Sequence, residues 1–108
     1  MREKFPDRVP LIVERAPGAR IGLIDKSKFL VPADLSLMEV TYIIRKRLTL
    51  KPEETLNIFI ETTFSASSRR VHVKPPATSS LASIYSGYKD QDGFLYLLYC
   101  EENTLGAS

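Results

Sequence analysis

The sequence predicts an α+β fold, a mixed four-stranded sheet with one helix across one face. Three observations indicate this class: four short apolar runs with strand character, an amphipathic stretch that follows a helix-capping motif, and a last run that is apolar on both faces. The chain has 108 residues, of which 44% are hydrophobic and 26% charged. This is the size and composition of one globular domain, so we predict a single domain over residues 1–108.

Residues 9–15 and residues 29–31 are the first two predicted strands. The first run is rich in β-branched residues and ends at the turn signal Pro17-Gly18, and the second is stopped by Pro32. The glycine-containing and charged residues between them suit the loop of an antiparallel hairpin.

A helix is predicted to begin at Leu37. Ser36 and Glu39 have the spacing of a capping box, in which each side chain pairs with a backbone N–H that the helix start leaves unpaired. The following apolar residues recur three and four apart, which is the pattern of one buried helix face. They are Leu37, Val40, Ile44 and Leu48, with Ile43 alongside.

The second half of the chain predicts two further strands and a short helix. Aliphatic residues stand at every second position, Leu56, Ile58 and Ile60, which indicates a strand with one buried face. A short helix is predicted to start near residues 78–80, and residues 94–100, apolar on both faces, suit a central strand. A helix across a mixed sheet that closes on a buried last strand predicts a β-grasp.

Two segments do not fit this core. Residues 65–74 form a basic, Ser-rich insert, and residues 101–108 form a polar tail that we expect to be flexible. Net charge is +2 overall, and residues 1–51 hold eleven Lys or Arg against six Asp or Glu. Acidic peptides, nucleic acid and anionic lipid are all compatible with that basic half.

The residue inventory argues against an enzyme or a metal protein. The chain has one His and one Cys, His72 and Cys100, and Cys100 ends the predicted buried strand, where it suits a small core residue. Its five glycines form no phosphate-binding loop, and its basic clusters lack interleaved aromatic residues, which disfavours nucleic acid as a partner. We therefore expect no catalytic residue, no metal and no cofactor. The single cysteine and the absence of a secretory signal predict a reducing cytosol.

Five local strings, in order along nearly the whole chain, resemble one family. They are residues 5–10, 28–35, 44–47, 92–96 and 102–106. The chain resembles the autophagy ubiquitin-like modifiers, the family of the GABA-A receptor-associated protein and the microtubule-associated light-chain modifiers. The resemblance implies a ubiquitin-like β-grasp whose N-terminal helical extension is shortened, because only residues 1–4 precede the first string.

The resemblance also implies a processing and conjugation site at Gly106. A dedicated cysteine protease would cut after Gly106 and remove Ala107 and Ser108, and ubiquitin-like activating and conjugating enzymes would transfer Gly106 to phosphatidylethanolamine. Glycine suits this role because a residue without a side chain passes through narrow enzyme clefts. The protein would then be a cytoplasmic monomer that moves to the autophagosome membrane when lipidated. Two alternatives stay open, an unconjugated adaptor and a modifier of protein lysines.

A second implied function is the docking of cargo receptors through acidic motifs with an aromatic and an aliphatic anchor. Such peptides would extend the sheet beside the second strand. By position, the aromatic pocket would be lined by Pro10, Ile12, Lys28, Leu30 and Phe94. The aliphatic pocket would be lined by Phe29, Val31, Pro32, Leu35, Val40 and Ile43, and the acidic residues would meet Lys26, Lys28 and Arg47. Leu105 and Val40 stand where aromatic residues are commoner in the family.

Overall fold

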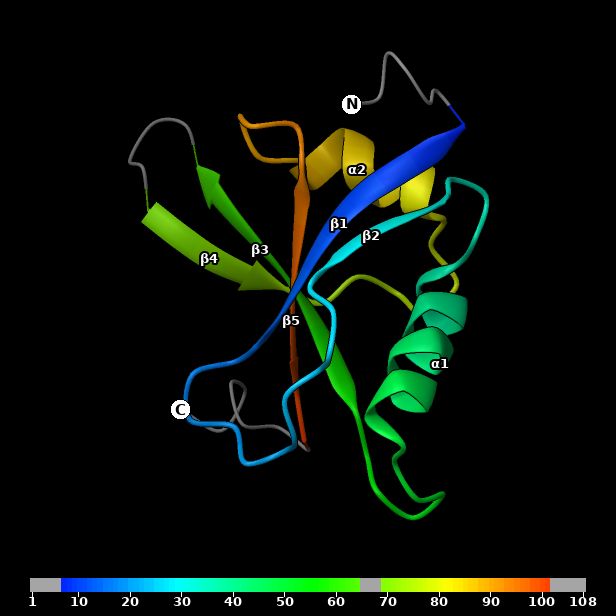
Figure 1. Cartoon of the computed structure of the whole chain (residues 1–108). Coiled ribbons are helices and arrows are strands. Elements are labelled where there is room, and N and C mark those ends of the chain that lie inside the picture. The colour runs from blue at the N-terminus through cyan, green and yellow to red at the C-terminus, as the bar shows by residue number, and fades with distance from the viewer. Residues whose placement is uncertain (1–6, 65–68, 102–108) are drawn as a thin grey trace.

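The structure is a computed structural model that describes residues 7–64 and 69–101. Its helices and strands follow one another in the order strand, strand, helix, strand, strand, helix, strand (Figure 1). They are β1 (Arg8–Arg15), β2 (Lys28–Pro32), α1 (Leu37–Leu48), β3 (Asn57–Phe64), β4 (Arg69–Val73), α2 (Leu81–Tyr88) and β5 (Leu95–Cys100).

All five strands belong to one sheet with the spatial order β2-β1-β5-β3-β4. The neighbours β1 and β5 are parallel, and every other neighbouring pair is antiparallel. The predicted α+β class with a mixed sheet is therefore confirmed. The predicted hairpin is also confirmed, since β1 and β2 pair antiparallel from Arg8 opposite Pro32 to Ile12 opposite Lys28.

The predicted strand count of four is wrong, because residues 69–73 of the predicted insert form β4. This strand pairs antiparallel with β3, with Ile60 opposite Val73 and Glu61 opposite His72. From Arg70 to Val73 the residues of β4 alternate between basic and apolar, which is the period of a strand with two unlike faces. The Ser-rich residues just before it concealed that period. Residues 65–68 lie outside the described part.

The predicted capping box is present at the start of α1. The Glu39 backbone N–H donates to Ser36 Oγ at 3.2 Å, and the Ser36 N–H donates to Glu39 Oε1 at 2.9 Å. The helix ends at Leu48 and is capped by Thr49, which adopts the left-handed conformation with a φ of 51°. The buried residues of α1 are Leu37, Val40 and Ile44.

Both helices pack on the same face of the sheet (Figure 1). Alternate residues of the central strands join them in one core, which includes Val9, Leu11, Val13, Ile60, Leu95, Leu97 and Tyr99. On the opposite face, here called the outer face, Leu98 and Cys100 of β5 pack with Ala16. The predicted central strand, apolar on both sides, and the buried Cys100 are thus confirmed.

Candidate functional site

Strand β2 lies at one end of the sheet, and within the described residues β1 is its only strand partner. In an antiparallel pair, directly opposite residues share a face. Leu30 is opposite Pro10 and Lys28 is opposite Ile12, so these four residues lie together on the outer face. The other edge of β2 leaves backbone groups for a further strand.

The outer-face cluster contains four of the five residues predicted for the aromatic pocket. Pro10 is less than 2% exposed, Ile12 and Leu30 are half-buried, and Lys28 is exposed. Ile12 is also opposite Tyr96 of β5. The fifth residue, Phe94, is half-buried and stands immediately before β5. The cluster is an apolar floor with one cation at its margin.

The helix side of β2 differs from the pattern expected of a pocket. Phe29 and Leu35 are partly buried and pack against the main core, and Pro32 is exposed at the end of the strand. Val31 and Val40 are 7% and 2% exposed and belong to the core itself. These two residues therefore offer little surface to a ligand.

A hollow of about 440 Å³ lies on α1, lined by Leu35, Met38, Glu39, Tyr42 and Ile43. Leu35 and Ile43 were predicted for the aliphatic pocket, and the other three were not. Met38 and Tyr42 are 57% and 61% exposed. Their spacing of four residues forms a second apolar stripe on the helix, which is the sequence signal that could have identified them.

Two of the three predicted cations meet at the ring of Phe29. Lys26 Nζ lies 5.3 Å from the ring centroid and Arg47 Cζ lies 5.5 Å from it, both within cation–π range. Arg47 also binds Asp25, with 3.0 Å between Nη1 and Oδ1. Because both partners are exposed, this ion pair contributes about 0–1 kcal/mol, and an incoming carboxylate can exchange with Asp25.

A hydrogen bond holds Glu101, the residue that follows β5, against the loop after β1. The Arg20 backbone N–H donates to Glu101 Oε2 at 2.7 Å. The pKa of Glu101 is lowered, first by a hydrogen bond with its own backbone and then by those from Arg20 and Ile21. The tail therefore starts beside residues 20–21. The predicted conjugation residue Gly106, with Ala107 and Ser108, lies outside the described residues.

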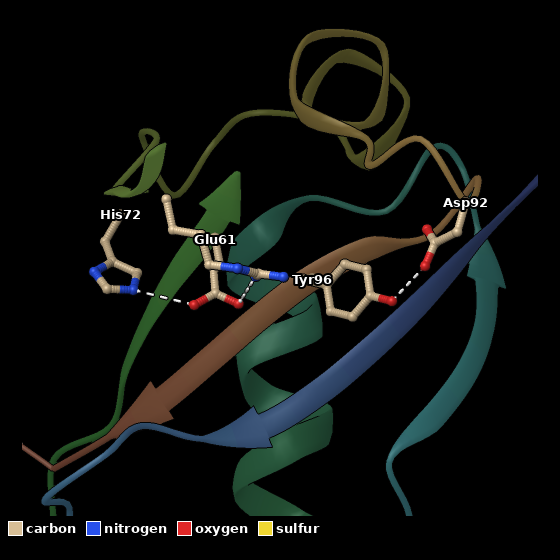
Figure 2. A network of polar contacts seen from close by, with 5 residues as sticks. Glu61, His72, Asp92 and Tyr96 are labelled. Atoms are coloured by element: carbon tan, nitrogen blue, oxygen red, sulfur yellow. Dashed lines mark hydrogen bonds and ion pairs between the residues drawn. The ribbon is translucent and has the colours of Figure 1, made fainter. Parts of the chain in front are cut away.

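A polar network occupies the outer face across β3, β4 and β5 (Figure 2). Glu61 accepts from Arg70 at 2.6 Å, and its other oxygen lies 3.4 Å from His72 Nε2. Tyr96 donates a short hydrogen bond to Asp92, which raises the pKa of Tyr96 to about 12 and lowers the pKa of Asp92.

Within residues 7–64 and 69–101, no group of three His, Cys, Asp or Glu residues could hold a metal ion. None of the described helices is long and apolar enough to cross a bilayer.

Comparison with known proteins identifies the family. The family model for "Autophagy protein Atg8 ubiquitin like" matches residues 1–106. The chain belongs to the Atg8 family. Autophagy-related protein 8d of Arabidopsis thaliana is 43% identical over 106 residues, 98% of this chain and 80% of that protein. Autophagy-related protein 8 of Aspergillus niger is also 43% identical over 106 residues, and 81% of its length is covered.

A solved structure gives the same result for the fold. The crystal structure of Trypanosoma brucei ATG8 matches with a TM-score of 0.72 and 40% identity, over 94% of this chain and 78% of that one. The resemblance to the autophagy ubiquitin-like modifiers, and the ubiquitin-like fold that it implied, are thus confirmed. As an Atg8-family chain, the protein is an autophagy ubiquitin-like protein.

Proposed function

We propose that this protein is a conjugated modifier of autophagy. A cysteine protease cuts the chain after Gly106 and removes Ala107 and Ser108. Ubiquitin-like activating and conjugating enzymes then join Gly106 to phosphatidylethanolamine. The protein is cytoplasmic before this reaction and bound to the autophagosome membrane after it.

Membership of the Atg8 family supports conjugation through the tail. The tail also leaves the sheet at the end of β5, where Tyr99 is opposite Arg15, whereas β2 pairs with residues 8–12 at the other end of β1. A lipid attached at Gly106 would therefore leave the β2 edge accessible from the cytoplasm.

The β2 edge is the proposed reader of cargo receptors. The observation that supports this proposal is that three features lie together at β2. They are an open strand edge, an apolar cluster on the outer face, and cations at Lys26, Lys28 and Arg47. An acidic peptide that adds as a strand can bond to the backbone of β2 while its aromatic side chain covers Leu30. Its aliphatic anchor then reaches the hollow between Leu35 and Ile43 on α1.

Reaction with the family's processing protease tests the conjugation half of the proposal. The 108-residue protein should lose the mass of Ala107 and Ser108, and Gly106→Ala should abolish the cut. Retention of the full mass by the wild type would contradict the proposal. Reconstitution with activating and conjugating enzymes and phosphatidylethanolamine vesicles should then yield a product that phospholipase cleaves.

Two other outcomes identify the alternative functions. An adaptor that is never conjugated would bind acidic-hydrophobic peptides and keep its cellular distribution after Gly106→Ala. A modifier of protein lysines would give conjugates that resist phospholipase. Either outcome would overturn the proposal of a lipid conjugate and would leave the proposal of peptide binding at β2 unchanged.

A further inference from the structure

Strand β4 forms the edge of the sheet opposite to β2 (Figure 1). Among the described residues it pairs with β3 alone. In an antiparallel pair, half of the backbone groups of an edge strand point away from its partner, so β4 presents a second row of backbone donors and acceptors. Within residues 7–64 and 69–101 the sheet therefore has two open edges, and the proposed function uses one.

The outer-face side of the β4 edge is basic. His72 lies there beside Glu61 (Figure 2), Arg70 binds the same carboxylate, and both basic residues are exposed. Lys74, the residue after β4, reaches the same face, where its Nζ lies 2.7 Å from Asn57 Oδ1 and over the ring of Phe59. The basic side chains recur at every second residue, which is the spacing of one face of a strand.

The other side of the β4 edge is apolar. Val73 packs against the main core and Val71 is half-buried. A strand added to β4 would thus meet cations on one face and valines on the other. Such a strand needs acidic residues at alternate positions and β-branched or other apolar residues between them.

The charges at this edge are only partly balanced. Glu61 is the carboxylate that contacts Arg70 and His72, and its side chain is 18% exposed. The Arg70 side chain is 60% exposed and extends beyond that ion pair toward solvent. Lys74 is bound to a neutral amide, so its charge has no carboxylate partner in that hydrogen bond. An acidic segment would supply the missing negative charge.

We propose that the β4 edge is a second docking site, which binds an extended acidic segment of a partner protein by strand addition. The segment alternates acidic residues, facing Arg70, His72 and Lys74, with β-branched residues facing Val71 and Val73. This site is independent of Gly106 and of the β2 edge. It therefore stands or fails separately from the proposed function.

A second copy of this chain does not fit the β4 edge. Two β4 strands placed side by side would bring Arg70, His72 and Lys74 of one copy against the same residues of the other. Like charges directly opposite one another destabilise a strand pair. The basic edge thus disfavours self-association and favours an acidic partner.

Titration with a fluorescent peptide that alternates Glu and Val over seven residues tests the proposal at neutral pH. The control peptide has the same acidic residues but Pro in place of the central Val, which removes a backbone donor and the extended register. We expect binding of the first peptide, and at least tenfold weaker binding of the second. Amide shifts in a ¹⁵N spectrum should be largest over residues 69–74.

Charge reversal locates the contact. Arg70→Glu with Lys74→Glu should weaken the first peptide by roughly tenfold or more, because each variant replaces an attraction by a repulsion. The matched control, Lys51→Glu with Lys89→Glu, changes the net charge equally at two exposed lysines outside both edges and should leave the affinity within about twofold. The neutral variant, Arg70→Gln with Lys74→Gln, should weaken peptide binding less than the charge reversal does. It introduces no repulsion that could unfold the protein, and the ¹⁵N spectrum of each variant shows whether the fold is intact.

Four results would overturn the proposal. They are equal binding of both peptides, amide shifts confined to residues 28–32, equal losses in the test and control variants, and displacement of the peptide by a single-stranded oligonucleotide that produces the same shifts over residues 69–74. The last result would assign the edge to nucleic acid.

Discussion

Leu30→Arg is the most direct probe of the proposed peptide edge. Leu30 is half-buried on the outer face, opposite Pro10, at the centre of the apolar cluster formed with Ile12. Arginine at this position replaces an apolar surface by a solvated cation. The side chain is not part of the main core, so the fold should survive the change at a cost of about 1 kcal/mol.

The expected loss of peptide affinity follows from the area that an aromatic anchor buries. A buried aromatic side chain covers about 150–250 Å². If arginine removes roughly half of that contact, about 100 Å² of apolar burial is lost, which at about 25 cal/mol per Å² amounts to about 2.5 kcal/mol. The dissociation constant should therefore rise by roughly 50- to 100-fold.

Calorimetry with a peptide that carries acidic residues, an aromatic residue and an aliphatic residue three positions later measures this change. Leu23→Arg is the matched control, because Leu23 is 72% exposed and lies outside β2. It should leave the affinity within about twofold. An unchanged affinity for a folded Leu30→Arg protein, or an equal loss for Leu23→Arg, would refute the placement of the aromatic pocket.

Three further predictions concern the fold. Ser36→Ala removes the acceptor for the Glu39 N–H and should lower stability by about 1 kcal/mol, seen as a fall of about 4–8 °C in Tm; no change would argue against the cap. The pKa of Asp92 is lower in the folded than in the unfolded protein, so its hydrogen bonds stabilise the fold above the unfolded pKa, near 3.8, and this stability is lost as the pH falls through the folded pKa. Asp92→Asn should remove that acid-sensitive contribution, measured by urea unfolding below pH 5, and should bring the pKa of Tyr96 from about 12 back toward 10, followed by phenolate absorbance. Cys100 is fully buried and should react with a thiol reagent only when urea unfolds the protein; rapid reaction of the native protein would contradict its placement.

Most of the fold could be predicted from local patterns. The capping box fixed the start of α1, and the continuous apolar run before Cys100 identified β5 as the central strand. Each of these signals is local, because it depends on only a few adjacent residues. The edge strand β4 was missed because its alternation covers only residues 70–73 and follows a Ser-rich stretch.

The candidate site was partly predictable for a related reason. The family resemblance assigned Leu30 and Lys28 to one pocket and Phe29 to the other, and the register with β1 places them on opposite faces of the sheet. Helical periodicity also predicted that Val40 is buried, and the structure places it in the core. The exposure of Met38 and Tyr42 around the hollow on α1 was not predicted, because it depends on which neighbouring segments cover that side of the helix.

Some contacts depend on the whole tertiary structure. The pairing of Arg47 with Asp25 joins residues 22 positions apart, and the contact between Arg20 and Glu101 spans 81. No periodicity in the sequence encodes either pair. The family resemblance therefore named Arg47 as a cation of the groove without its internal partner, Asp25.

The central claim is that this chain acts as a conjugate through Gly106. The most direct test is the intact mass of the protein recovered from cells in which autophagy has been induced. The account predicts a form that ends at Gly106 and carries the mass of phosphatidylethanolamine, and its absence from a Gly106→Ala strain. Recovery of only the full-length chain, still ending in Ala107 and Ser108, would contradict the account.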